Sequence, residues 1–396
     1  MSDSATLPLY MRRSLFDPAP ELVAVREREG VRRVATPFGL DVWVVTRFAD
    51  VREVLGDPER FSYGRQPRPP GAPDMPPEQV EAQRAGHLLL FDSPEHTRLR
   101  RMLTAEFTMR RMRRMEPRVH EIVRQRLDAM EAAGTPADLV ASFALPIPSL
   151  VICELLGVPY ADREEFQRRT SRLLDLSLSL EERAPIREAA RAYMGELVAR
   201  SRVEPGDDLL GMLVREHGDD LSTGELIGIG SLLLVAGHET TSNMLGLGTL
   251  ALLRHPDQLA LLRKEPERIG AAVEELLRWL SIVHSGMFKV TTAEVELSGV
   301  RIPEGAVVAV SLAAANRDPA LVPDPDRLDL SRGDLGHVAF GHGVHHCLGA
   351  PLARMEMQIA FPALFERFPG LREAGPQPEF RSMNVVYGLT SLPVVW

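Results

Sequence analysis

The chain has 396 residues, 44% of them hydrophobic and 26% charged, which is typical of a soluble globular protein with one large domain or two ordinary ones. Its formal net charge of −9 argues against a general nucleic-acid binder, which would normally be basic. The two cysteines, Cys153 and Cys347, argue against a disulfide scaffold and favour a reducing, cytoplasmic setting.

The sequence contains no pattern typical of a membrane span or an export signal. Its longest apolar stretch, residues 226–237, is well short of the roughly 18 residues that a membrane span needs. Residues 1–15 lack a basic segment followed by an apolar core, so we expect no signal peptide. We therefore expect a protein that does not bind membranes.

The predicted elements are mostly helices. Residues 42–46 alternate like a strand, and six prolines in residues 66–78 predict an irregular loop. Helical periodicity then dominates residues 118–132, 162–176, 186–202 and 222–254. Residues 290–311 alternate again, and 351–368 are helical. The sequence predicts a mainly α fold with a small β portion in a single domain, 1–396.

The segment 222–254 is the most informative predicted helix. Ser222 and Glu225 have the spacing of a capping box, and apolar residues on every face predict a buried helix. Its centre nevertheless holds the polar run 238–241, and buried polar groups cost free energy unless they are paired. Either the hydroxyl groups bond back to the preceding turn or the cluster has a chemical function.

A glycine-rich loop, residues 340–350, delivers Cys347 in front of the last predicted helix. Unpaired N–H groups and the positive partial charge of a helix N-terminus favour a thiolate there. Gly343 and Gly349 would allow a large flat cofactor to approach closely. An inert buried cysteine or a zinc site are the alternatives, but zinc usually needs four ligands. The Cys-x-x-Cys-His motif of c-type haem attachment is absent.

Phe340, Gly343, Cys347 and Gly349 resemble the haem-binding loop F-x-x-G-x-[RH]-x-C-x-G of the cytochrome P-450 monooxygenases. Four further segments resemble family motifs in the right order. They are residues 92–100, similar to the bacterial haem-propionate helix; 236–240, similar to [AG]-G-x-[DE]-T; Glu275 to Arg278, similar to E-x-x-R; and 325–328, whose Arg327 would join that pair.

The resemblance implies a triangular, helix-rich domain with helix 222–254 over the haem and an irregular substrate-access loop at 62–90. It implies haem b, with Cys347 as the axial ligand to the iron. The other cofactor-binding residues that it implies are His96, Arg100, Lys289, His345, Phe340, Gly341, Ala236 and Gly349. His96 and Arg100 share one helix face and would reach the propionates. At Lys289 the family usually has an arginine, so this lysine would bind a propionate or instead a polar group of the substrate.

Thr240 and Glu239 are the implied catalytic residues, because they would relay protons above the iron. The expected reaction inserts one oxygen atom from dioxygen into a hydrophobic small molecule, by hydroxylation or epoxidation. The mostly aliphatic lining favours a macrolide or another polyketide from bacterial secondary metabolism. The expected substrate-binding residues are Leu90, Leu233, Val235, Ile282, Val283, His284 and Val386. A peroxide-driven peroxygenase and a haem-thiolate sensor without turnover are the alternatives.

The electrons must come from outside the chain. No G-x-G-x-x-G stretch suits NAD or flavin, so we expect NAD(P)H to act through a ferredoxin reductase and a ferredoxin. A basic patch would steer the acidic ferredoxin. It comprises Arg98, Arg101, Arg110, Arg111, Arg113 and Arg114. We expect a monomer.

Overall fold

The computed structural model describes residues 7–36, 39–65, 76–163, 175–284, 288–333, 335–375, 377–381 and 383–396. The larger α-helices are α1 (Pro20–Arg28), α2 (Phe48–Gly56), α3 (Pro77–Arg84), α4 (Glu95–Thr104), α5 (Met109–Ala133), α6 (Pro146–Leu156), α8 (Leu180–Val203), α9 (Leu209–His217), α10 (Thr223–Arg254), α11 (Pro256–Lys264), α12 (Ile269–Leu280) and α14 (Ala350–Arg367). Short helices are η1 (Leu9–Met11), η2 (Leu88–Leu90), η3 (Val140–Ala144), η4 (Tyr160–Asp162), η5 (Pro266–Arg268), α13 (Leu312–Ala315) and η6 (Gly343–His345).

The strands are short and form five small sheets in the described part of the chain. They are β1 (Arg13–Ser14), β2 (Asp17–Pro18), β3 (Val31–Ala35), β4 (Asp41–Val45), β5 (Phe61–Ser62), β6 (Ala137–Asp138), β7 (Phe288–Thr291), β8 (Val295–Leu297), β9 (Val300–Ile302), β10 (Val307–Val310), β11 (Arg372–Glu373), β12 (Phe380–Arg381), β13 (Gly388–Leu389) and β14 (Pro393–Val395). The predicted mainly α fold with a small β portion is confirmed.

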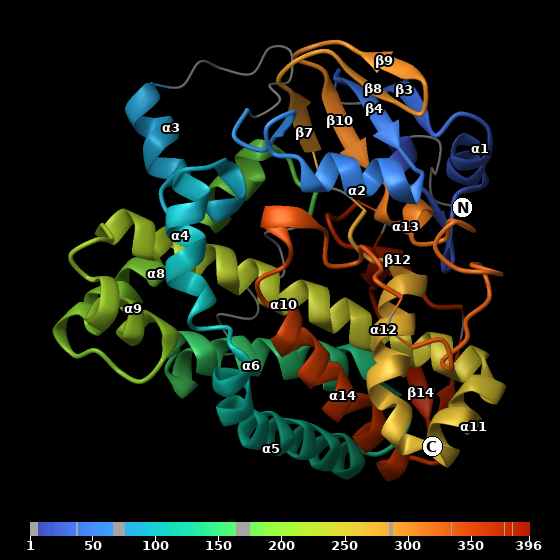
Figure 1. Cartoon of the computed structure of the whole chain (residues 1–396). Helices are drawn as coiled ribbons and strands as arrows, with labels where there is room; N and C mark the ends of the chain where they lie inside the picture. Colours follow the sequence, from blue (N-terminus) through green and yellow to red (C-terminus); the bar gives the residue numbers. More distant parts are fainter. Residues whose placement is uncertain are drawn as a thin grey trace.

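Helix α10 crosses the middle of the molecule (Figure 1) and packs against α6, α8 and α14. Its N-cap residue Ser222 and Glu225 form the predicted capping box, which fixes where the helix begins. The apolar side chains of α10 join one large core cluster with those of α5, α6 and α14. This helix is therefore the central support on which the candidate site is built.

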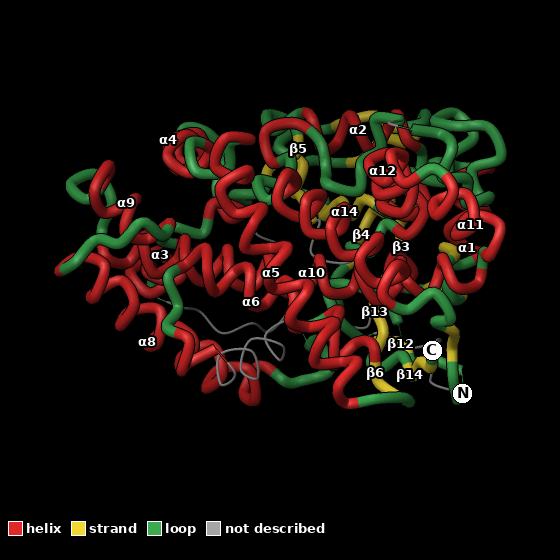
Figure 2. Tube along the Cα trace, turned by 90° about the horizontal axis from the view of Figure 1, so that it is seen from below, coloured by secondary structure: helices red, strands yellow, loops and turns green. Residues whose placement is uncertain are grey.

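The largest sheet has the strand order β3-β4-β10-β7-β5 and lies on one side of α10, next to α2 (Figure 1). β10 runs parallel to β4, and the other neighbours are antiparallel. Lys289 of β7 pairs with Val308 of β10. Seen from below, the small strands β6, β12, β13 and β14 lie together, away from this sheet (Figure 2).

The structure corrects one prediction about the first half of the chain and leaves most of another outside the described residues. The segment 62–90 is not irregular throughout, because residues 77–84 form α3 and 88–90 form η2. Pro77 stands in the first turn of α3, where a proline needs no backbone donor, so the proline run partly signals a helix start. Most of the proline-rich run, residues 66–75, and most of the helix expected at 162–176, residues 164–174, lie outside the described residues.

Residues 85 and 86 anchor the end of this segment on the first turns of α10. A Cβ added at Gly228 would lie 1.8 Å from the carbonyl oxygen of Ala85, and one added at Gly86 would lie 2.0 Å from that of Glu225. Gly86 also has a φ of 74°, which disfavours other residues. The two glycines therefore let the backbones touch, which places η2 and α4 close to the site.

Candidate active site

The loop before α14 presents Cys347. Gly341 and Gly343 adopt positive φ values of 74° and 72°, and a Cβ on Gly343 would lie 2.8 Å from the Leu55 carbonyl oxygen. The Cys347 N–H donates to the Phe340 carbonyl at 2.9 Å, which closes the loop. No described atom lies within 4 Å of a Cβ built on Gly349, so this glycine leaves open space beside the cysteine.

The Cys347 side chain is exposed, although many protein atoms lie around it. Burial raises the pKa of its thiol, while the N–H groups of Gly349 and Ala350 and the charges of Arg100 and Arg354 lower it. The predicted influence of the helix N-terminus is thus present, but burial outweighs it. A metal ion bound to the sulfur would lower the pKa of the thiol despite burial, because a thiol that coordinates a metal ion is deprotonated.

Four basic side chains from three segments meet beside this loop: His96 and Arg100 of α4, Lys289 of β7 and His345 of η6. Burial, followed by the charges of His96 and Lys289 and then that of Arg100, lowers the pKa of His345 to about 3 despite the opposing effect of Asp92. Burial lowers the pKa of Lys289 to about 8. Burial and the neighbouring basic groups disfavour the charged forms, so an anion beside these residues would favour their protonation.

The nitrogens of this cluster are open to such an anion. Nε2 of His96 and both ring nitrogens of His345 are buried and find no hydrogen-bond partner among the described residues. The Lys289 ammonium is 1% exposed and donates to the Leu55 carbonyl at 3.4 Å. Buried polar groups normally have partners, and carboxylates pair well with such donors. The four residues therefore fit the two propionates of a haem whose iron would meet Cys347.

The predicted polar cluster lies at the middle of α10. Most of this helix is buried, but Ala236 is exposed and Thr240, one turn later, is half-buried. The Thr240 hydroxyl donates to the Ala236 carbonyl at 2.7 Å, so the bond back to the preceding turn is confirmed. These two residues make one open face on an otherwise covered helix.

The Glu239 side chain contacts other residues than Thr240 does. Its carboxylate is 1% exposed, and its Oε2 lies 3.2 Å from Nη1 of Arg381 on β12 and 3.4 Å from Nδ2 of Asn243. Burial raises the pKa of Glu239, whereas Arg381 and Asn243 lower it. A Cβ on Gly388 would lie 1.5 Å from Asn243 Oδ1, so this glycine lets β13 approach α10. Sequence reasoning missed Arg381, which is 142 residues away along the chain.

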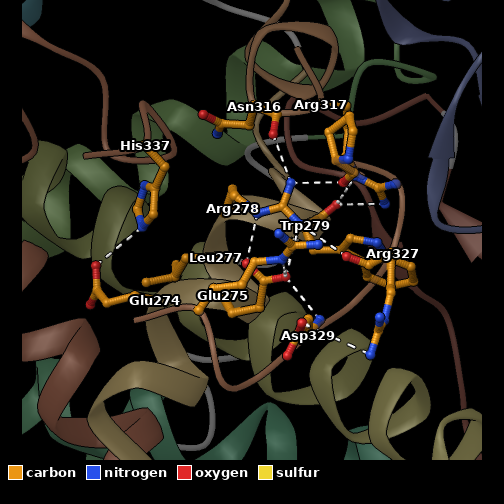
Figure 3. Close-up of polar contacts among 12 residues, drawn as sticks. Glu274, Glu275, Leu277, Arg278, Trp279, Asn316, Arg317, Arg327, Asp329 and His337 are labelled. Carbon is orange, nitrogen blue, oxygen red and sulfur yellow. Dashed lines mark hydrogen bonds and ion pairs between the residues drawn. The ribbon is translucent and has the colours of Figure 1, made fainter. Parts of the chain in front are cut away.

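The E-x-x-R motif forms a fully buried ion pair on α12 (Figure 3). Arg278 donates to both oxygens of Glu275 at 2.7 and 2.8 Å. It also donates to the carbonyl oxygens of Asn316 and Pro325, both at 2.8 Å. The pair thus holds the chain that runs from α13 towards the Cys347 loop.

The prediction that the Arg327 side chain joins this pair is wrong. Only its backbone carbonyl accepts from Arg278, at 3.3 Å; its guanidinium is 66% exposed and lies 4.0 Å from Asp329 (Figure 3). Arg332 takes the expected place, with Nε 3.5 Å from Glu275 Oε1. Residues 325–328 determine the path of the backbone, and this path places the Arg327 carbonyl next to Arg278. They do not determine the direction of the exposed Arg327 side chain.

A second acid on α12 supports Phe340 of the Cys347 loop. Burial alone would raise the pKa of Glu274, but hydrogen bonds from Arg354 and His337 lower it to about 2. Arg354, held at 2.6 Å by this carboxylate, lies 4.6 Å over the Phe340 ring. Figure 3 shows His337 reaching Glu274 from outside the helix. Neither His337 nor Arg354 belongs to a motif noted in the sequence.

The expected substrate-binding residues come from three parts of the chain. Residues 282–284 run beside 385–387, with Val283 and Val386 paired antiparallel and the Tyr387 N–H donating to the Ile282 carbonyl at 2.8 Å. His284 is buried, and its Nε2 lies 2.7 Å from the Asn384 carbonyl oxygen. Leu233 and Val235 lie on α10 and Leu90 ends η2. Their role in substrate binding stays a prediction.

Similarity to known proteins identifies the family of this chain. The family model "Cytochrome P450" matches residues 199–391. The chain is 49% identical over 399 residues to cytochrome P450 FAS1 of Rhodococcoides fascians, with 100% of both chains covered. This chain belongs to the cytochrome P450 family. It is also 44% identical to mycinamicin IV hydroxylase/epoxidase of Micromonospora griseorubida, over 94% of each chain.

Two solved structures bear out the cytochrome P450 fold. P450 StaH from glycopeptide antibiotic A47934 biosynthesis is 45% identical, with a TM-score of 0.88 over 98% of this chain and 100% of StaH. CYP105P1 in complex with filipin I is 40% identical, with a TM-score of 0.91 over 97% of each chain. The protein is therefore a haem-thiolate monooxygenase that takes electrons from external partners. In the described part of the chain no helix is long and apolar enough to cross a membrane.

Proposed function

We propose that this cytochrome P450 hydroxylates or epoxidises a macrolide or another large hydrophobic polyketide in bacterial secondary metabolism. The observation that carries the proposal is that three of the expected aliphatic pocket residues, Leu233, Ile282 and Val386, belong to one hydrophobic cluster of buried side chains. A mostly apolar pocket with few polar groups is typical of sites for such ligands. The similarity to mycinamicin IV hydroxylase/epoxidase and to CYP105P1, which was solved in complex with filipin I, supports this class of substrate.

Cys347 would bind the iron, and His96, Arg100, Lys289 and His345 would hold the propionates. Bound haem with a thiolate ligand supplies dioxygen activation, because the thiolate favours cleavage of the O–O bond. The protein would contribute proton delivery. The Thr240 hydroxyl stands on the open face of α10 and can pass on a proton if its bond to the Ala236 carbonyl is released.

Glu239 would resupply that proton. Its Oε1 is buried and has no hydrogen-bond partner among the described residues, and its raised pKa favours the protonated carboxyl. Its Oε2 is held by Arg381, whose side chain is 25% exposed and therefore borders solvent. The acid thus contacts a partly exposed arginine of β12 and is next to Thr240 in the sequence.

The redox partners are proposed to be a ferredoxin and an NAD(P)H-dependent ferredoxin reductase. Two arginines of the expected docking patch are engaged within the chain: Arg98 with Glu95 and Glu225, and Arg111 with Glu106 at 3.2 Å. The remaining four are exposed and make no ion pair with a described residue: Arg101, Arg110, Arg113 and Arg114. This smaller group would still attract an acidic partner.

A single domain spanning 1–396, a monomeric state and a cytoplasmic location complete the proposal. The cysteines support a reducing location, since neither forms a disulfide. Burial raises the pKa of Cys153 to about 12, so it is an inert core thiol. Analytical ultracentrifugation of the purified protein tests the monomer.

Turnover with ferredoxin, its reductase, NAD(P)H and ¹⁸O-labelled dioxygen tests the reaction. Macrolides that shift the haem absorption band on binding are the substrates to use. The proposal predicts a product that carries one labelled oxygen atom. A product formed only with added peroxide would instead indicate a peroxygenase, and binding without any product would indicate a sensor.

A further inference from the structure

A column of four neighbouring side chains lies between β7 and α4. The Lys289 ammonium is 4.5 Å from the centre of the Tyr63 ring. The Tyr63 ring centre is 4.4 Å from that of His345, and the His345 ring centre is 4.0 Å from that of His96. Three members of this column, Lys289, His345 and His96, are expected to bind the haem propionates. Tyr63 is the fourth, and no motif in the sequence includes it.

Asp92 fixes the turn that carries Tyr63. Its carboxylate accepts the N–H groups of Tyr63 and Gly64, both at 3.0 Å, and the Ser62 hydroxyl. Ser62 ends β5, which pairs with β7 next to Lys289. The turn is therefore tied both to the strand of Lys289 and to the segment before α4, which leaves the Tyr63 side chain 7% exposed inside the site.

A lysine at position 289 needs neighbouring groups that fix the direction of its ammonium. Its ammonium is a compact point charge on a flexible stem, without the rigid fork of a guanidinium. Burial penalises that charge, and the Leu55 carbonyl at 3.4 Å is its only hydrogen-bond acceptor among the described residues. The negative face of an aromatic ring attracts a cation, most strongly where water is excluded. Tyr63 offers such a face to Lys289 and also contacts the His345 ring.

We propose that Tyr63 is a positioning residue of the haem site, whose ring fixes Lys289 and His345 so that both point at one haem propionate. Tyr63 thereby takes over part of the orientation that an arginine at position 289 would provide by its own shape. The proposal rests on haem binding, which family membership establishes. It also decides the role of Lys289 in favour of the propionate rather than the substrate.

The test changes the charge of the ring face while keeping its shape. Tyr63 is replaced by phenylalanine and by pentafluorophenylalanine, whose face no longer attracts cations. The measurement is the rate at which the holoprotein loses haem to excess apomyoglobin. We expect the fluorinated variant to lose haem about tenfold faster than Tyr63→Phe, because both variants lack the hydroxyl and differ in the charge of the ring face. In a Lys289→Met background the difference between the two rings should disappear.

Two controls separate this role from general stability. Tyr160 lies under Arg163 at 5.3 Å but is 79% exposed and outside the site, so the same fluorinated substitution there should leave haem loss unchanged. Circular dichroism of the two Tyr63 holoproteins should give the same helix content, which shows that both variants are folded. Equal haem loss from both variants, or a fluorine effect that persists without Lys289, would overturn the inference. Native protein that binds no haem would instead contradict the cofactor assignment.

Discussion

Replacing Arg278 by leucine should destabilise the protein severely. Arg278 and Glu275 are both 0% exposed and form a two-point ion pair. Removing one partner of a buried pair costs about 3–5 kcal/mol, because the other charge stays buried without compensation. The carbonyls of Asn316 and Pro325 also lose their donor, at about 1–3 kcal/mol each when buried and unsatisfied.

Because these contributions overlap, they do not add in full, and we expect a loss of about 5 kcal/mol in the free energy of unfolding. Native domains have only about 5–15 kcal/mol in total. Arg278→Leu should therefore accumulate poorly and retain little haem. Urea unfolding followed by circular dichroism measures the difference for whatever folded protein is recovered.

Arg327→Leu is the matched control, because it removes an arginine of the same motif region whose side chain is 66% exposed. It should change the unfolding free energy by no more than about 0.5 kcal/mol. If Arg278→Leu costs less than about 2 kcal/mol, or no more than Arg327→Leu, the buried pair does not support the site as described.

Two further predictions concern proton delivery. Thr240→Ala should keep haem and substrate binding but divert NAD(P)H electrons into peroxide, lowering coupled turnover by about 10²–10⁴; unchanged coupling would remove Thr240 from the relay. Arg381→Leu should raise the pKa of Glu239 further, because a cation that lowers it is lost. Since the acid must be protonated to deliver its proton, the fall of coupled turnover on the alkaline side should move to higher pH, and a shift to lower pH would contradict this role.

The sequence predicted the long helices and the Cys347 loop because both depend on local signals. Apolar spacing marks α5 and α14 along most of their length, and Ser222 with Glu225 marks the start of α10. Helix α3 was missed because it buries no side chain, so it has no apolar periodicity.

The partners of the site residues were harder to predict. Tyr63 meets Lys289, and Arg381 meets Glu239, only after distant strands have paired. No spacing in the sequence encodes such contacts. Arg332 rather than Arg327 reaches Glu275 for a related reason, since the direction of a long side chain depends on the folded backbone around it.

The central claim is that Cys347 would ligate the iron of the bound haem. The most direct test is the absorption spectrum of the reduced protein with carbon monoxide, for the native chain and for Cys347→Ser. The native protein should show the red-shifted band of a thiolate-ligated haem, and the variant should lose it. A variant spectrum that matches the native one, or a native spectrum without that band, would contradict the assignment.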